Sequence, residues 1–170
     1  MTKLKRIILV LFIILSCVGC DQITKTLAKS HLPRARVLSF AGDTLRFDYA
    51  ENKGAVLTFE HSVPEKWRGP TFTLAVAAVL ALIIMCLLLA SGLHPLTVIA
   101  LSLIWGGIFS NLLDRVVLDG YVVDFLNMGW GAFRTGIFNM ADVAISIGSC
   151  LLALNIIWNF AVACKERLEW

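Results

Sequence analysis

The stretch PTFTLAVAAVLALIIMCLLLASGLHPLTVIALSLIWGGIFSNLL, residues 70–113, decides the fold class of this chain. Its 44 residues contain no Asp, Glu, Lys or Arg. A helix needs about 20 apolar residues to cross a bilayer, so the run is long enough for two helices. Gly92 and Pro95 interrupt it, and these two residue types together favour a tight turn. We therefore expect two antiparallel spans, over residues 70–90 and 95–113.

A third span is expected near the C-terminus. Residues 138–164 are apolar throughout, and their only charged residue is Asp142. The whole chain has the same character, because 58% of its 170 residues are hydrophobic and 16% are charged. Soluble domains carry about 25% charged residues. The composition therefore favours an integral membrane protein over a freely soluble one.

The N-terminal segment allows two interpretations. Basic residues at positions 3, 5 and 6 precede a charge-free run over 7–20. Such a start fits a secretory signal, and it also resembles the box cleaved ahead of a lipidated cysteine, which here would be Cys17 or Cys20. The apolar pattern continues to Ala28, however. We therefore favour a retained first span over residues 7–28.

The predicted fold class is a membrane α-helical protein with four transmembrane helices, forming one integral-membrane domain over residues 1–170. Residues 29–69 differ from the spans, because Pro and Gly separate short β-favouring runs at 36–40 and 44–49. They predict a small extracytoplasmic β-rich element between helices 1 and 2. The second run alternates apolar and polar residues, which is typical of a strand with one face in water. Residues 114–135 are expected to be a polar loop.

Basic residues at both ends favour cytoplasmic termini. Lys3, Lys5 and Arg6 precede the first span, and Lys165 and Arg167 follow the last. The loop over 29–69 carries seven basic and five acidic residues, so a raw count would also allow the reverse orientation. With cytoplasmic termini, residues 29–69 and 114–135 share the outer face.

Several functional classes lack support in the sequence. The net charge is +3 with no dense basic block, so nucleic-acid binding is not expected. The five cysteines have neither disulfide-framework nor metal-site spacing. The three histidines form no nucleophile–base arrangement, and we expect no metal and no cofactor.

Four aspartates fall at the outer ends of the predicted spans and in the loop between them, namely Asp21, Asp114, Asp124 and Asp142. Charged groups are costly there unless they are paired, solvated or functional. Two carboxyl groups close together in a poorly solvated site share one proton, so one can act as base and the other as acid. The pattern predicts either an aspartic hydrolase or a membrane module that relays protons.

Five short motifs carry a resemblance to a known family. They are DQITK at 21–25, NKGA at 52–55, SNLLDR at 110–115, VVDF at 122–125 and FNMAD at 138–142. In this order they resemble the bacterial lipoprotein signal peptidases, also called signal peptidase II, which are membrane aspartic proteases with four transmembrane helices. The resemblance covers nearly the whole chain.

The resemblance implies an activity and a set of residues. The enzyme would cut the signal peptide of a prolipoprotein immediately before a diacylglyceryl-modified cysteine, at the outer boundary of the bacterial inner membrane. Its catalytic residues would be Asp124 and Asp142. The other matching positions line the site or hold the substrate, and they are Asp21, Gln22, Asn52, Gly54, Asn111, Arg115 and Asn139. We expect the partners to be the prolipoprotein and membrane lipid, and the chain to be a monomer.

Some of these residues also have purely structural interpretations. Asp21 and Lys25 stand at i and i+4, where an ion pair on a helix surface is worth about 0.3–0.5 kcal/mol. Asp114 and its neighbour Arg115 are interpreted as a local charge pair that closes a helix. Asn139 suits a helix N-cap, with Asp142 in the first turn.

Departures from the family pattern leave alternatives open. Lys53 stands where the family has a Thr, and Asp119 and Gly120 lengthen the loop before Asp124 by one residue. A catalytically specialised or inactive paralogue is one alternative. A non-enzymatic proton-relaying module, and a lipoprotein cleaved at its own Cys17 or Cys20, are the others.

Overall fold

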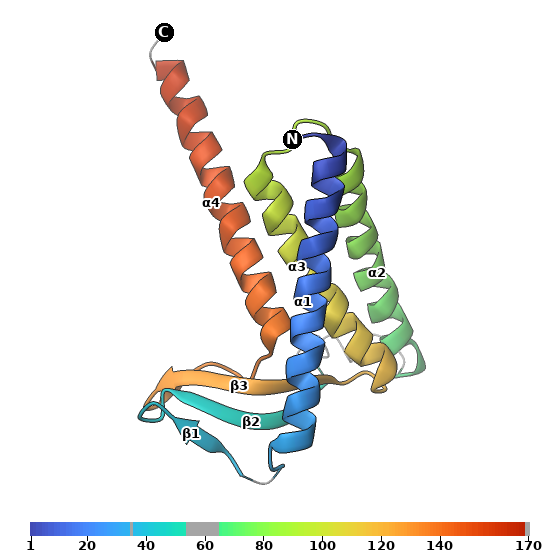
Figure 1. Cartoon of the computed structure of the whole chain (residues 1–170), viewed down its shortest axis with the longest axis vertical. Coiled ribbons are helices and arrows are strands. Elements are labelled where there is room, and N and C mark those ends of the chain that lie inside the picture. The colour runs from blue at the N-terminus through green and yellow to red at the C-terminus, as the bar shows by residue number, and fades with distance from the viewer. Residues whose placement is uncertain (35, 54–64, 169–170) are drawn as a thin grey trace.

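Four long helices dominate the structure, a computed structural model that describes residues 1–34, 36–53 and 65–168 (Figure 1). All four are long and apolar enough to cross a membrane, which confirms the predicted fold class. The first helix extends beyond both predicted ends, and it passes through Cys17 and Cys20 without a break. The helices are α1 (Lys3–His31), α2 (Glu65–Leu89), α3 (Pro95–Val117) and α4 (Met140–Leu168).

The predicted break between the second and third spans is present. Helix α2 ends at Leu89, and α3 begins at Pro95, where a proline suits the first turn because it lacks an amide hydrogen. His94 is the N-cap, and its side chain accepts a hydrogen bond from the Leu96 amide. Arg6 of α1 hydrogen-bonds to the end of α2 and the start of this turn: Nη1 donates to the Ala90 carbonyl and Nη2 to the Leu88 carbonyl.

Small residues let α3 approach its neighbours closely. A Cβ at Gly106 would lie 2.9 Å from the Cβ of Cys17 in α1, and one at Gly107 would lie 2.5 Å from the Ala141 carbonyl oxygen in α4. Such residues allow membrane helices to pack backbone to backbone. Gly106 and Gly107 therefore serve helix packing, and α3 forms the centre of the bundle.

A four-stranded antiparallel sheet lies at the end of the bundle opposite both termini (Figure 1). Strands β1 (Leu38–Phe40) and β2 (Leu45–Asn52) belong to the predicted β element. Strands β3 (Val122–Trp130) and β4 (Phe133–Arg134) do not, because they fall in the region expected to be a polar loop. That expectation is wrong. The first four residues of β3 are all buried, so the strand lacks the alternation that marks a half-exposed one.

The pairing of β2 with β3 sets the position of Asp124. Ala50 lies opposite Asp124 and Asn52 lies opposite Val122, after a register shift between Phe47 and Ala50. The burial of β2 differs from the prediction, since its first six residues are all half-buried instead of alternating. Both faces of the strand are therefore partly covered.

The loop before Asp124, which the sequence predicts to be one residue longer than in the family, is a compact turn. Asp119 and Gly120 have φ of 51° and 93°, and the Gly120 amide donates to the Arg115 carbonyl at 2.8 Å. The Leu118 amide donates to the Asp114 carbonyl. Left-handed residues that close on the last helical turn are a common helix C-terminus. The chain then enters β3 directly.

Candidate active site

Asp124 and Asp142 come from different elements and are linked through two asparagines. The Asn139 amide nitrogen Nδ2 donates to Asp124 Oδ1 at 2.7 Å and to Asn111 Oδ1 at 3.1 Å. Asn111 in turn donates through its own Nδ2 to Asp142 Oδ1 at 3.0 Å. A continuous chain of hydrogen bonds therefore joins the two carboxyl groups.

Asp142 is held by the start of its own helix. The Asn139 backbone amide donates to Asp142 Oδ2 at 3.1 Å, and the Asp142 amide donates to Asn139 Oδ1 at 3.0 Å. This reciprocal arrangement has the pattern of a capping box, which satisfies amides that a helix start leaves unpaired. The cap predicted for Asn139 is confirmed, and the same side chain also reaches Asp124.

Asp124 is held from both sides on β3. Its second oxygen, Oδ2, accepts a hydrogen bond from Asn52 Nδ2 at 2.9 Å, across the pair of strands β2 and β3. Asp124 is 2% exposed, whereas Asp142 is half-buried. Two amide donors therefore fix both oxygens of a carboxyl group that is shielded from water.

The surroundings of Asp124 shift its protonation. Burial raises the pKa of its carboxyl, and the charge of Asp142 acts in the same direction. The hydrogen bonds from Asn52 and Asn139 and the charge of Lys25 oppose this rise, but the pKa remains above its ordinary value. Burial together with a second nearby carboxylate is the environment in which two acids share one proton.

A second buried cluster, centred on Lys25, contacts the pair through Asn111. The Lys25 ammonium nitrogen lies 2.6 Å from Asp21 Oδ2 and 2.9 Å from Asp114 Oδ2. It also donates to Asn111 Oδ1 at 2.9 Å. Lys25 is 2% exposed and Asp21 is fully buried, so their ion pair is an internal contact between helices and not the surface pair that the sequence suggested.

The carboxylates of this cluster have further donors. Asp21 accepts from the Ser110 hydroxyl at 2.7 Å and from the Ala141 amide at 2.8 Å. Asp114 accepts from Gln22 Nε2 at 2.9 Å and from the Val123 amide at 3.1 Å. These bonds connect α1, α3, β3 and the start of α4.

The charge pair expected between Asp114 and Arg115 is not the contact that the structure shows. Successive residues of a helix point in different directions, and Asp114 turns inward to Lys25. Arg115 donates through Nη1 to the Asn111 carbonyl at 3.2 Å and lies over the Phe72 ring of α2. Lys53 likewise lies over an aromatic ring, that of Tyr121, with its nitrogen 5.0 Å from the centroid.

Most of the site residues predicted from the sequence meet at this end of the bundle. Gly54 lies outside the described residues. The site residues predicted from the sequence do not include Lys25 and Ser110. The position of Lys25, four residues after Asp21 in an apolar helix, could have indicated it. The residues brought together are Asp21, Gln22, Asn52, Asn111, Arg115, Asp124, Asn139 and Asp142.

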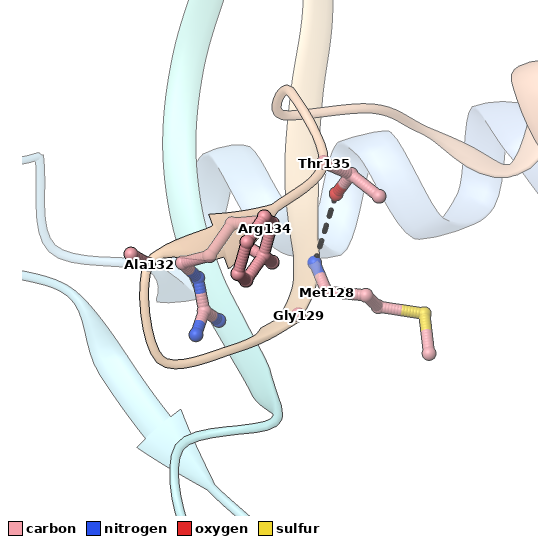
Figure 2. A pocket seen from close by; sticks show the side chains of 6 residues that line it. Met128, Gly129, Ala132, Arg134 and Thr135 are labelled. Carbon is pink, nitrogen blue, oxygen red and sulfur yellow. Dashed lines mark hydrogen bonds between the residues drawn. The ribbon is translucent and has the colours of Figure 1, made fainter.

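An open pocket of about 620 Å³ lies elsewhere, at the hairpin of β3 and β4 (Figure 2). The Met128 amide donates to the Thr135 hydroxyl in its wall. The pocket is lined by Met128, Gly129, Ala132, Phe133, Arg134 and Thr135. It contains none of the aspartates. In the described part of the chain, no group of three or more His, Cys, Asp or Glu side chains is arranged to hold a metal ion.

Four spanning helices with linked aspartates at one end are the arrangement expected of a membrane peptidase of the aspartic type. Comparison with known families agrees. The chain belongs to the Signal peptidase (SPase) II family, whose model matches residues 13–158. It is therefore a multi-pass membrane hydrolase, and this favours the enzyme over the proton-relaying module.

Curated relatives of similar length support the assignment. The lipoprotein signal peptidase of Geobacter metallireducens is 34% identical over 137 residues, covering 81% of this chain and 83% of the relative. The lipoprotein signal peptidase of Acinetobacter baumannii is 36% identical over 138 residues, covering 79% of this chain and 75% of the relative.

Solved structures share the fold. One, described as a bacterial membrane enzyme, superposes with a TM-score of 0.71 at 23% identity, covering 89% of this chain and 92% of the other. A second with the same description has a TM-score of 0.72 at 22% identity, covering 92% of this chain and 89% of the other.

Proposed function

We propose that this chain removes the signal peptide of prolipoproteins by cutting immediately before a diacylglyceryl-modified cysteine, with Asp124 and Asp142 as the catalytic residues. One observation carries the assignment of residues: the asparagine bridge that links the two carboxyl groups in a buried setting. The names of the relatives support the substrate.

The chemistry follows from a proton shared between the pair. In the one-proton state, the ionised carboxylate takes a proton from a water molecule as that water attacks the scissile carbonyl carbon. The protonated partner donates a hydrogen bond, then its proton, to the carbonyl oxygen. In the collapse of the tetrahedral intermediate the C–N bond breaks: the carboxyl group that gave its proton to the oxygen takes a proton back from a hydroxyl of the intermediate, and the carboxyl group that took the proton from water gives it to the leaving nitrogen. The two carboxyl groups thereby return to their starting state.

The remaining site residues hold this pair and the substrate. Asn52, Asn111 and Asn139 orient the carboxyl groups, and Asp21 and Gln22 support the site from α1. Arg115 is half-buried at the same end of the bundle, and we assign its guanidinium to the substrate backbone. The Arg115 guanidinium lies over the Phe72 ring of α2. A cation next to an apolar ring suits a peptide that carries a lipid.

The proposed orientation has both termini in the cytoplasm and the sheet at the outer boundary of the inner membrane. Basic residues near both ends of the chain support it. Both termini and the turn between α2 and α3 lie at one end of the bundle, away from the sheet (Figure 1). We propose that the protein works as a monomer, since all the residues of the carboxyl pair come from one chain.

Paired substrates test this function. The purified protein in detergent receives a prolipoprotein with the diacylglyceryl group on its cysteine, and in parallel the same chain without that group. Mass spectrometry identifies the cut bond. The proposal predicts one cut before the lipidated cysteine and little cleavage of the unmodified chain. Equal cleavage of both, or cleavage of neither, would contradict it.

A further inference from the structure

Lys25 has no role in the chemistry described so far, although it is a buried cation whose charge acts on Asp124. Its ammonium group has three hydrogens, and the structure provides three acceptors, on Asp21, Asp114 and Asn111. Two of these contacts are charge pairs. The third goes to a neutral amide that itself contacts Asp142.

This third contact fixes the orientation of the Asn111 side chain. An ammonium group has donors only, so the atom facing it must be the amide oxygen. Asn139 Nδ2 donates to the same oxygen at 3.1 Å. The Asn111 NH₂ group must therefore face the other way, and it lies 3.0 Å from Asp142 Oδ1. A flipped amide would place NH₂ against two donors and its oxygen against a carboxyl group.

We propose that Lys25 is a positioning residue for the carboxyl pair: it holds the Asn111 amide so that Asn111 presents an N–H to Asp142 while Asn139 presents an N–H to Asp124. The inference rests on the proposed function of the pair. Lys25 also adds a positive charge near both carboxyl groups. The other charged groups around the site are Asp21 and Asp114 in the cluster, and Arg115 on α3.

Loss of Lys25 leaves two buried carboxylates without their cation, so its effect on position has to be separated from its effect on stability. Asp21 keeps the Ser110 hydroxyl and the Ala141 amide as donors when Lys25 is lost, and Asp114 keeps the Gln22 side chain and the Val123 amide. Asn111 Oδ1, by contrast, would keep only the donor from Asn139 among its contacts in the structure. Loss of Lys25 therefore leaves both carboxylates with hydrogen-bond donors, but leaves Asn111 Oδ1 with only one.

The test compares Lys25→Met with Lys25→Met/Asp114→Asn, in which the lost cation is balanced by removal of one buried anion. Asn155→Leu is the matched control, because Asn155 is 8% exposed and donates across the bundle to Thr97, away from the site. Melting temperatures in detergent identify the folded variants. The titration of Asp124 is followed through the NMR signal of its labelled carboxyl carbon, a measurement that does not require activity.

The proposal predicts a higher titration midpoint for Asp124 in Lys25→Met, because the Lys25 charge lowers the pKa of that carboxyl in the parent. The rise is smaller in Lys25→Met/Asp114→Asn, where removal of an anion offsets the lost cation. It also predicts that kcat falls about 100-fold while KM changes little, since misplacing a reacting group by about 1 Å has an effect of that size. Asn155→Leu keeps the parent titration and kcat.

A double-mutant cycle shows whether Lys25 acts through Asn111. If it does, Lys25→Met adds little to the loss that Asn111→Leu causes alone. Additive losses, an unchanged Asp124 titration in Lys25→Met, or failure of both Lys25 variants to fold would each overturn the proposal, the last because Lys25 would then be needed for stability. Failure of the parent protein to cleave any lipidated substrate would instead refute the proposed function, and the titration would still decide the role of Lys25.

Discussion

At the scale of single residues, Asn139 combines two tasks in one side chain. Its oxygen accepts from the Asp142 amide and caps α4, while its nitrogen donates to Asp124. The sequence favours the cap, because Asn followed three residues later by a carboxylate is a known helix start. It does not reveal the second task, since Asp124 lies on a different element and only the folded chain brings the two together.

The two tasks of Asn139 can be separated by substitution. Asn139→Ala removes both, so we expect a loss of about 1 kcal/mol in stability from the missing cap together with a large loss of kcat. Asn139→Ser keeps a capping oxygen but has no amide to reach Asp124, so stability recovers and kcat does not. Thermal unfolding and cleavage rates measure the two effects. Recovery of kcat in the Ser variant would contradict the assignment of the amide.

The pH dependence is a second prediction at this scale. The pair is active with one proton, so the rate falls at high pH when that last proton is lost. Because the Asn52 hydrogen bond stabilises the Asp124 carboxylate and lowers its pKa, Asn52→Ala raises that pKa further. We expect the alkaline limb of kcat/KM to move to higher pH. A shift to lower pH would contradict the assignment.

At the scale of elements, the helices were predictable and one strand was not. A neutral run of residues longer than one span, with Gly and Pro near its middle, is a strong signal for two helices. Strand β3 lacks such a signal because four consecutive residues are buried, and its partner β2 comes from a distant segment. The helix containing Asp21 also continues to His31, which places Asp21 inside α1 and not at its end.

The contact of α3 with α4 carries a prediction. A Cβ at Gly107 would meet the backbone carbonyl of Ala141, one residue before Asp142. We expect Gly107→Ala to cost about 1–3 kcal/mol through overpacking and to lower kcat by displacing the start of α4. Gly19→Ala is the matched control, since nothing lies within 4 Å of its added Cβ. Thermal unfolding and cleavage rates compare the two, and equal behaviour would contradict the packing argument.

At the scale of the whole molecule, described residues from five motifs far apart in sequence meet at one end of the bundle. The resemblance to a family named most of these residues, but spacing alone does not show how they connect. The contacts of Lys25 with Asp114 and Asn111 join residues of α1 and α3, and no local rule predicts them. They depend on how closely α1 and α3 pack.

The orientation in the membrane is testable in cells. Ser39 lies in β1 and Ser91 in the turn between α2 and α3, and both are exposed. In a cysteine-free background, we expect Ser39→Cys to react with a membrane-impermeant maleimide on spheroplasts. Ser91→Cys is expected to react only after the membrane is disrupted. The reverse pattern would show that the termini lie outside.

The most direct test of the central claim is the rate at which purified Asp124→Asn and Asp142→Asn variants cleave a diacylglyceryl-modified prolipoprotein. Asparagine keeps the shape of each side chain but cannot exchange the proton, so we predict losses of about 100- to 10,000-fold in kcat for both. Melting temperatures should stay near that of the parent, and Asn155→Leu should cleave at the parent rate. Cleavage at the parent rate by either aspartate variant would contradict the account.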